Sequence, residues 1–490
     1  MNLTNRQKIA HLLRRFGLGA TERELAHLEP MGIEGALDHL LNFEKENEGF
    51  PVSPWEICRE PGKTEIYLDG YRFAAWWALR LLMTQRPAEQ KLTFFWHNHF
   101  AVSGEKVEFG PMLYGYLETL RTYGTGEFPA LLKAVAKDPA MLRYLDGDTS
   151  VRNHPNENFA RELMELFTLG KGNYTEHDIQ EAARSLTGWG NRYLLYEVPA
   201  EDFQAKLQSC LTRNVPLVTS SFSPDLHDDR VKSVLGKQAN YDTDSLLEMI
   251  AAKPQTAYFV TQKLWHFYAS DEISSPVANR LAHRYIKTNG SIRDILFEIA
   301  KTDEFWDESC IRRRVKSPLD FVVPILRQFG LYPILAGMHG AIPSPDTPLA
   351  KPLRDASGIV LGPMAKQGMT LLFPPNVGGW DWGQSWITPN NMLARVQFAD
   401  MILGVGEPEQ PLAAFLAKQV TDSNPITSYN SVIKFLQIFD ADLPPEKQFL
   451  LIQAFDKAGG LASLKTPSGA SRSLSAVARL LFSAPEFQVC

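Results

Sequence analysis

The sequence is poor in cysteine and lacks any segment typical of a membrane or secreted protein. Its 490 residues include only four cysteines, Cys58, Cys210, Cys310 and Cys490, and no CxxC pair. This spacing favours free, mostly buried thiols over a disulfide framework or a thiolate zinc site. No apolar run reaches the ~18 residues needed to span a bilayer. Residues 1–21 lack the apolar core of a secretory signal, so the sequence predicts a cytoplasmic protein.

Strong charge of one sign is also missing. The chain has 50 Lys and Arg against 56 Asp and Glu, and the basic residues are scattered apart from short runs such as Arg312–Arg314. No basic stripe is present, so a nucleic-acid partner is not expected. Several catalytic signatures are absent as well: HExxH, the paired ExxH of di-iron bundles, GxxxxGK[ST] and GxSxG. Function must therefore be sought in less regular groups of polar residues.

What the sequence does contain is helical periodicity and, at 44% hydrophobic residues, enough apolar material for a large core. It predicts a mostly α, multi-helix globular fold. A capped helix is expected between Thr175 and Gly188, with Asp178 completing a short capping box. Phe128 to Leu145 should form two helices that break before Pro139. Further helices are expected over residues 9–16, 71–83, 87–100, 155–169, 245–252, 255–269, 292–305 and 318–329.

Other segments depart from this pattern. Residues 191–241 contain short β-branched or aromatic runs and predict an irregular insertion with a small hairpin. Residues 335–349 and 373–388, which are rich in Gly and Pro, are expected to be loops. Four or five helices should follow in residues 391–487. We therefore expect a helical domain over residues 1–400, and a C-terminal helical subdomain over residues 401–490 packed on it.

The densest polar segment is residues 153–170. On a helix, residues three or four apart are neighbours, so Glu157, Arg161 and Glu165 form one stripe, which Asn158 and Glu162 overlap. Apolar residues occupy much of the remaining circumference, which predicts a largely buried helix. Buried carboxylates must be paired, protonated or bound to a cation. The segment is therefore either a lattice in which Arg161 bridges Glu157 and Glu165, or a catalytic site.

Histidines provide candidate partners for these acids. His97 and His99 stand two apart, so they face opposite sides of a regular helix and converge only if the helix ends between them. One hydrogen-bonded core histidine among aromatic residues is an equal alternative. His227, in His227-Asp228-Asp229, is a weaker candidate because a solvated loop is the default there. Asp146-Gly147-Asp148 is either a cation site or a turn with Asx hydrogen bonds.

Together these residues form a hypothetical metal site. Mixed imidazole and carboxylate ligands suit zinc, iron or manganese. The proposed ligands are His97, His99, Glu162, Glu165 and His227, and the proposed catalytic residues are Glu157, Asn158, Arg161 and Glu162. Residues 372–387 carry three tryptophans among Gly and Pro, and form either a ligand platform or a loop plugged into the core. We favour the plug because tryptophan is usually well buried.

A series of motifs resembles a bacterial family known as domain of unknown function 1800. In order, the motifs are His11 to Thr21, Trp96 to Phe100, Asn156 to Gly170, Tyr174 to Glu176, Leu186 to Trp189, His227-Asp228, Lys316 to Pro318, Pro374 to Val377 and Gly379-Trp380. The resemblance covers nearly the whole chain. It implies a single helical family domain and supplies no reaction. In the family, many members look exported and a sulfatase-like protein is a frequent gene neighbour, so such a protein is the partner that the resemblance suggests.

Two functions remain open at this point. The first is a metal-dependent or acid–base enzyme on helix 155–169, with hydrolysis as the leading reaction and oxidative iron chemistry as the second. Histidines would act as ligands or proton carriers, glutamates as ligands or general base, and Arg161 would orient a carboxylate or an anionic substrate. The second is a non-catalytic binding or scaffold protein whose polar helix is a structural ion-pair lattice.

Overall fold

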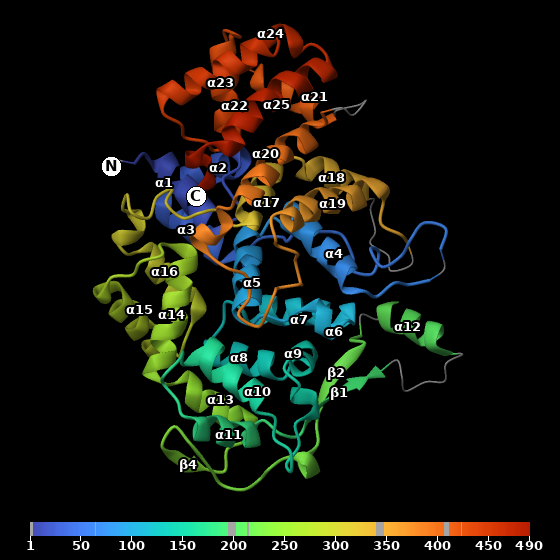
Figure 1. Ribbon diagram of the computed structural model, residues 1–490, viewed down its shortest axis with the longest axis vertical. Coiled ribbons are helices and arrows are strands. Elements are labelled where there is room, and N and C mark those ends of the chain that lie inside the picture. The colour runs from blue at the N-terminus through green and yellow to red at the C-terminus, as the bar shows by residue number, and fades with distance from the viewer. Residues whose placement is uncertain are drawn as a thin grey trace.

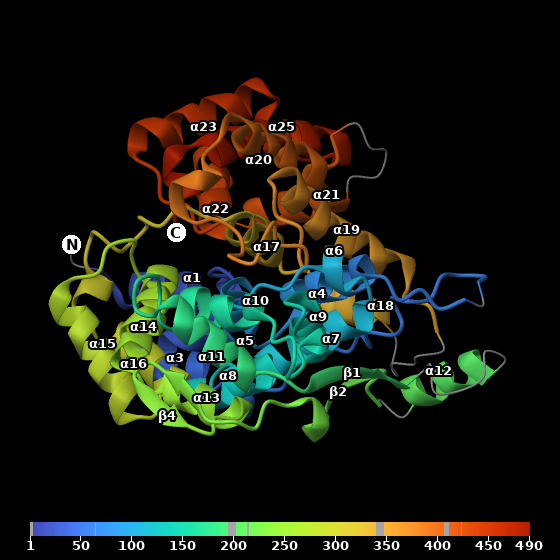
Figure 2. The ribbon, with the colours of Figure 1, turned by 60° about the horizontal axis from the view of Figure 1, so that its bottom comes forward.

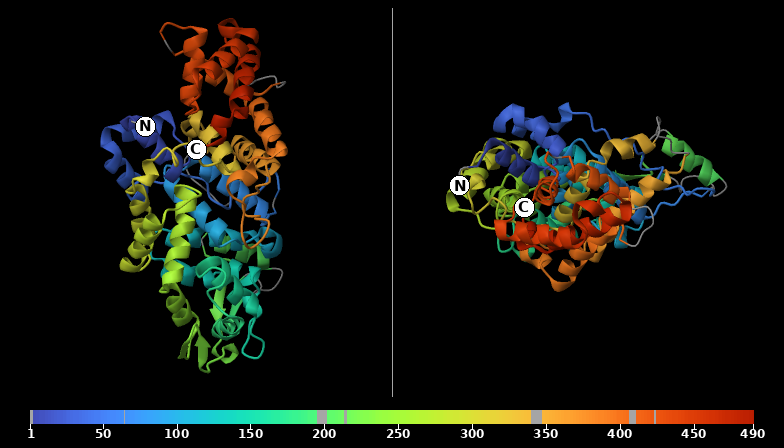
Figure 3. Two further views of the ribbon diagram at one scale, coloured as in Figure 1. Left: turned by 60° about the vertical axis from the view of Figure 1, so that its left-hand side comes forward. Right: turned by 90° about the horizontal axis from the view of Figure 1, so that it is seen from above.

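The computed structural model describes residues 3–63, 65–194, 202–212, 215–339, 347–405, 411–422 and 424–490. It confirms a mostly α fold with a small β-hairpin insertion. Figure 1 shows the C-terminal helices at the top and a larger helical body below them. The left view of Figure 3 shows that these helices form one end of an elongated molecule.

The centre of the body is helix α5 (Pro87–His99), and all of its residues are buried. Pro87 opens the helix at a position where a missing N–H costs nothing. Helices of the first half of the chain pack around α5 and one another: α1 (Asn5–Phe16), α2 (Glu22–Leu28), α3 (Gly32–Leu41), α4 (Gly70–Met83), α6 (Gly104–Val107), α7 (Gly110–Tyr123), α8 (Phe128–Ala136) and α9 (Pro139–Tyr144). The predicted break before Pro139 is confirmed.

The polar segment forms α10 (Glu157–Glu162), which continues as a π-helix over Leu163–Thr168. We call this second part the π turn. Helix α11 (Glu176–Ser185) follows, and Thr175 and Asp178 form the predicted capping box. Three further helices cover the side of the body shown at the left of Figure 1, α14 (Pro254–Tyr268), α15 (Ser275–Lys287) and α16 (Ile292–Ala300), and α13 (Thr243–Ala251) lies near α8.

The predicted insertion contains two small antiparallel pairs. Strand β1 (Trp189–Tyr193) pairs with β2 (Val218–Phe222), and β3 (Lys232–Val234) pairs with β4 (Lys237–Ala239). Between β1 and β2 lies a helix that the sequence analysis missed, α12 (Phe203–Thr212), and Figure 2 shows it at the end of the projecting β1–β2 pair. The predicted strand residues 195–196 lie outside the described residues.

The described part of the last third of the chain is mostly helical, with a long loop near its middle. Its helices are α17 (Pro318–Gln328), α18 (Tyr332–His339), α19 (Lys351–Lys366), α20 (Pro389–Leu403), α21 (Pro411–Val420), α22 (Ser428–Ile438), α23 (Pro445–Lys457), α24 (Gly460–Ser463) and α25 (Pro467–Ser483). Helix α18 shows that the expected loop at 335–349 was wrong over residues 335–339, because Pro333 stands in the first turn of the helix, where proline is tolerated. Residues 340–346 lie outside the described ranges, and residues 347–349 are non-helical as expected. The loop between α19 and α20 has the predicted position.

Two further findings bear on the sequence predictions. All four cysteines are free and buried. Within the described ranges, no single helix has the length and hydropathy to cross a bilayer, although α17 and α18 pass that test as a pair bent by 82°.

Candidate functional site

The Trp96–Phe100 run gives each of its polar side chains a separate structural contact. His97 is completely buried and stacks on Trp380, with ring centroids 5.5 Å apart, and Trp77 covers another side at 5.4 Å. Neither ring nitrogen of His97 has a hydrogen-bond partner in the described part of the chain. Burial lowers the pKa of His97 to about 3, so the imidazole is neutral. His97 thus faces an aromatic box and not the acids of α10.

Asn98 connects α5 to the tryptophan loop, 282 residues further along the chain. Its side-chain oxygen accepts from Trp380 N at 2.6 Å, and its side-chain nitrogen donates to Trp380 O at 3.3 Å. The amide therefore pairs with the loop backbone as a neighbouring strand would. Trp380 and Trp386 are buried as the plug interpretation predicts, whereas Trp382 stays 42% exposed.

His99 and Lys263 satisfy carbonyl groups that the end of the π turn leaves free. His99 Nε2 donates to Phe167 O at 3.0 Å, and Lys263 Nζ donates to Leu166 O at 3.0 Å. The last carbonyls of any helix have no partner within it and need an external donor when buried. Burial, followed by the charge of Lys263, holds the pKa of His99 well below its usual value. Burial also lowers the pKa of Lys263 to about 8.

The His227-Asp228 pair is bound to the end of α11. His227 Nδ1 donates to Thr187 O at 2.9 Å, and Asp228 N donates to Thr187 Oγ1 at 2.9 Å. The buried Asp228 carboxylate accepts from Arg230 and Arg184. The hydrogen bond from Arg230 holds the pKa of Asp228 well below its usual range. Burial opposes this shift, and the hydrogen bond from Arg184 adds to it. This motif fastens the insertion to the body.

These placements separate the proposed metal ligands. His97, His99 and His227 each contact a different part of the fold, and only Glu162 and Glu165 remain neighbours. Among the residues that the structure describes, no three His, Cys, Asp or Glu side chains form a group that could hold a metal ion. The five predicted ligands are therefore not assembled into one site. Two histidines at i and i+2 on a continuous helix cannot converge.

The acids of α10 are more exposed than the sequence predicted. Arg161 lies 3.5 Å from Glu157 and forms two hydrogen bonds with Glu176 of α11, so its second partner is Glu176 and not Glu165. The winding changes to the wider π form between Arg161 and Glu165, which removes the i,i+4 alignment that the prediction assumed. The side chains of Glu157 and Arg161 are 41% and 38% exposed, so this is a solvent-facing pair and not a buried lattice.

Glu165 is held by a tyrosine and a lysine. Tyr174 Oη donates to Glu165 Oε2 at 2.9 Å, and Lys171 Nζ lies 3.1 Å from Oε1. Although burial opposes the shift, these two contacts hold the pKa of Glu165 below its usual value. Burial and the hydrogen bond to Glu165 raise the pKa of Tyr174 to about 12. Glu165 is therefore ionised at neutral pH.

Glu162, one turn earlier, has the opposite environment. It is half-buried and has no hydrogen bond or ion pair with any residue in the described ranges. Burial, followed by the charge of Glu165, raises its pKa. Tyr144, at the end of α9, lies near Glu162. The pKa of Tyr144 is raised by burial first, then by the charge of Glu105, and then by the charge of Glu162. Glu162 is thus an unpaired carboxyl group at a partly dry surface.

The remaining predicted residues have structural positions. Asn158 is exposed, and its backbone N–H donates to Asn156 Oδ1 at 2.8 Å, which caps α10. Asp146 adopts a left-handed turn and pairs with Lys106 at 2.7 Å, while Asp148 accepts from Asn191 at 3.3 Å. Asp146-Gly147-Asp148 therefore forms a turn with its own ion pair and hydrogen bond.

Sequence reasoning missed Lys263, Tyr144 and the role of Tyr174. A lone lysine in the apolar and aromatic helix 254–268 was the available signal for Lys263. The partner of Lys263 is the backbone carbonyl of Leu166, 97 residues earlier, and the sequence alone could not identify it.

Replacing His97 with phenylalanine tests its structural role. At pH 7 we expect stability within about 1.5 kcal/mol of wild type, because no hydrogen bond is lost and the ring shape is similar. In the wild type the unfolded chain binds a proton near pH 6.5, whereas the folded chain does so only near pH 3. The stability that neutral His97 contributes is therefore present above pH 6.5 and is lost below it, at up to about 1.4 kcal/mol per pH unit.

Urea unfolding between pH 7 and pH 4 measures this difference. The His97→Phe variant should lose stability less steeply than wild type, while His177→Gln, at an exposed position of α11, should follow the wild-type curve. Equal slopes for the wild type and His97→Phe would contradict the assignment.

With the geometry established, comparison with known proteins gives one match. A family described as "Protein of unknown function (DUF1800)" matches residues 11–489. Searches of curated proteins and of solved structures return no match to this chain. Because the family match covers nearly all of the sequence, the protein belongs to the DUF1800 family.

Proposed function

We propose that the protein is an enzyme whose acid–base centre lies on the outer face of α10 and the π turn. One observation carries the proposal: Glu162 and Glu165 are neighbours whose surroundings shift their pKa values in opposite directions. When two carboxyl groups have pKa values shifted apart in this way, each suits a different task. Glu162, with the raised pKa, is suited to exchange a proton, and Glu165, with the lowered pKa, is suited to stabilise positive charge. Perturbed acids also mark functional sites more often than ordinary surface positions do.

The surrounding residues support distinct roles. Glu162 has no partner in the described chain, so it is free to give or take a proton at a bound substrate. Glu165 stays ionised beside Tyr174 and Lys171, and offers a fixed negative charge. Arg161, at the exposed edge, orients an anionic group of the substrate in this proposal. Hydrolysis is the reaction class that such a pair supports first, and elemental analysis of the purified protein tests the separate expectation of zinc, iron or manganese.

Glu162→Gln is the decisive variant. It preserves shape and removes the titrating proton, so we expect about a hundredfold loss of turnover, within the range of general acid–base catalysis. The wild type is first assayed on a panel of chromogenic carboxylic esters, phosphate esters and glycosides. The variants are then compared on whichever substrate the wild type hydrolyses. Glu248→Gln is the control, because Glu248 is an exposed acid on α13 that pairs with Lys133 and has no part in the proposed centre. Equal activity in Glu162→Gln and Glu248→Gln would refute the assignment.

A second function, non-catalytic binding or scaffolding, has an observation of its own in its favour. The side chains of His97, Asn98, His99 and His227 are all used in packing or in backbone hydrogen bonds. If no member of the panel is turned over by the wild type, and Glu162→Gln lowers the melting temperature by several degrees, this second function is favoured.

A further inference from the structure

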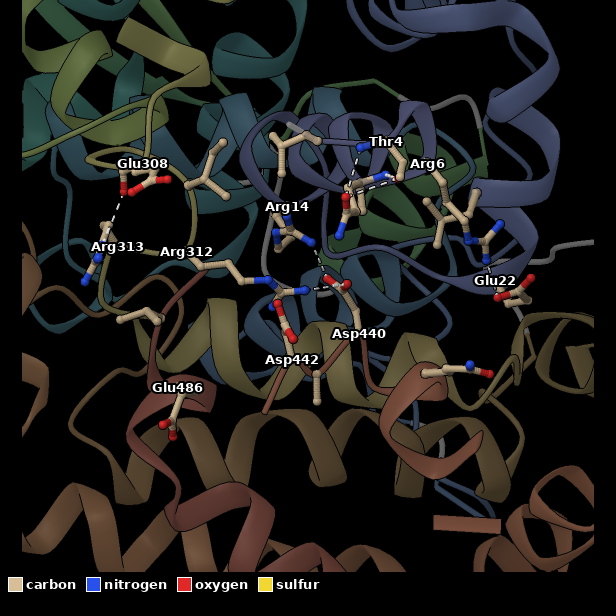
Figure 4. A pocket seen from close by; sticks show the side chains of 18 of the residues that line it. Thr4, Arg6, Arg14, Glu22, Glu308, Arg312, Arg313, Asp440, Asp442 and Glu486 are labelled. Carbon is tan, nitrogen blue, oxygen red and sulfur yellow. Dashed lines mark hydrogen bonds and ion pairs between the residues drawn. The ribbon is translucent and has the colours of Figure 1, made fainter. Parts of the chain in front are cut away.

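A cleft of about 980 Å³ opens between the N-terminal helices and the C-terminal helical group. Residues 3–25, residues 308–313 and residues 434–489 contribute to its lining, so three distant parts of the chain meet there (Figure 4). Its volume is at the upper end of the range typical of pockets for small molecules. The cleft is separate from the acids of α10, so an inference about it does not depend on the proposed enzyme site.

Two arginines share one carboxylate in this cleft. Arg14 Nη1 lies 2.7 Å from Asp440 Oδ2, and Arg312 Nη2 lies 2.9 Å from Asp440 Oδ1. Figure 4 shows the two guanidinium groups reaching Asp440 from different elements. The side chain of Arg14 is only 6% exposed, and its Nε has no hydrogen-bond partner among the described residues. Donor capacity on the arginines therefore exceeds what Asp440 accepts.

A third cation lies near this pair. Lys316 lines a smaller adjoining cavity together with Arg14, Arg312, Asp320 and Asp440. Burial lowers the pKa of Lys316 to about 7, and burial followed by Arg312 lowers that of Arg14 to about 10. Asp440 and Cys490 oppose these shifts. The two arginines therefore repel each other while they share one acid, and an anion bound between them would reduce that repulsion.

The rim of the cleft carries acids as well as cations. Two of the acids are held in ion pairs: Glu22 with Arg6 at 2.7 Å, and Glu486 with Lys447 at 2.6 Å. The rim carries two further acids and two further cations, Glu308, Asp442, Arg313 and Lys434.

The backbone is left-handed at both partners. Arg312 has φ +52° and Asp440 has φ +47°. At Asp440 this follows from its place just after α22, where a left-handed residue commonly ends a helix. Arginine rarely adopts this region, and such strain is found most often at ligand clamps and active sites.

We propose that this cleft binds a small molecule carrying a carboxylate or phosphate group, which Arg14 and Arg312 receive. The planar guanidinium matches both groups with paired hydrogen bonds. The ligand displaces part of the contact with Asp440, so that carboxylate acts as a placeholder for the bound anion.

Isothermal titration of the full chain at low salt tests the proposal, with citrate as the carboxylate probe and pyrophosphate as the phosphate probe. We expect saturable binding of at least one probe. Arg312→Asn should weaken it at least tenfold, and asparagine tolerates the left-handed backbone, so this variant should fold. Arg280→Gln, which removes a half-exposed arginine on α15, should bind as wild type does.

Asp440→Asn should act in the opposite direction. It removes the competing carboxylate, so binding should tighten at least threefold. No saturable binding of either probe, or wild-type affinity in Arg312→Asn, would overturn the proposal. The probe that binds more tightly identifies the anion class.

Discussion

Replacing Asp320 with asparagine is expected to lower the free energy of unfolding by about 3–5 kcal/mol, as for other buried ion pairs broken on one side. Asp320, in the first turn of α17, forms an ion pair with Lys91 of α5. The two side chains are only 6% and 2% exposed. Arg314 lies 3.7 Å from the same carboxylate, and Ser317 Oγ donates to it at 2.8 Å. The substitution leaves Lys91 charged, buried and without its counter-ion.

The same pair predicts sensitivity to acid. Burial opposes ionisation of Asp320, but Lys91 and Arg314 together hold its pKa well below its usual value. A carboxyl group with a depressed folded-state pKa contributes stability above the unfolded value of roughly 4, and that stability is lost as pH falls below it. Asp320→Asn should therefore be less stable than wild type at pH 7, and the difference should narrow toward pH 3.

Urea unfolding monitored by tryptophan fluorescence at several pH values measures both effects. Asp355→Asn is the matched control, since Asp355 forms an exposed i,i+4 pair with Lys351 and should change stability by no more than about 0.5 kcal/mol. If the two variants lost similar amounts of stability, the buried pair would not have the energetic role assigned to it.

The sequence predicted those parts of the fold that depend on local rules. Helix positions follow from apolar spacing, and the break before Pro139 and the capping box of Thr175 and Asp178 follow from residues only a few positions apart. Helices α12 and α18 were missed because short segments near Gly, Pro and β-branched residues carry weak periodicity. The expected helices also did not include α2, α3, α6, α7, α15 and α19.

The chemistry of the polar motifs was harder to predict, because their partners are backbone atoms far along the chain. Asn98 pairs with Trp380, and His99 with the carbonyl of Phe167. No rule of spacing connects a side chain to a distant carbonyl, so polar residues with structural roles resembled metal ligands. The predicted pairing of Arg161 with Glu165 was wrong for a different reason. The prediction assumed regular α-helical winding, but the segment that contains Glu165 is π-helical.

Gly379 provides the test of this connection between α5 and the tryptophan loop. Its φ is +83°, and a Cβ atom added there would lie 2.1 Å from Asn98 Oδ1 and 2.5 Å from the backbone oxygen of Asn98. Gly379→Ala combines backbone strain with a clash inside the core, so we expect a loss of about 3 kcal/mol or more. Thermal unfolding measures the loss, and near-ultraviolet circular dichroism reports the environment of Trp380.

The neighbouring glycine offers a matched control. A Cβ atom at Gly378 would meet only the side-chain oxygen of Asn376 at 3.0 Å, so Gly378→Ala should cost no more than about 1 kcal/mol. Asn98→Ala removes one of the two groups that the new methyl in Gly379→Ala would strike. The combined variant Asn98→Ala with Gly379→Ala should therefore lose less stability than the sum of the single losses, as expected for residues in contact. Strictly additive losses would mean that Asn98 does not hold the loop. The side-chain amide of Asn98 would then have some other role.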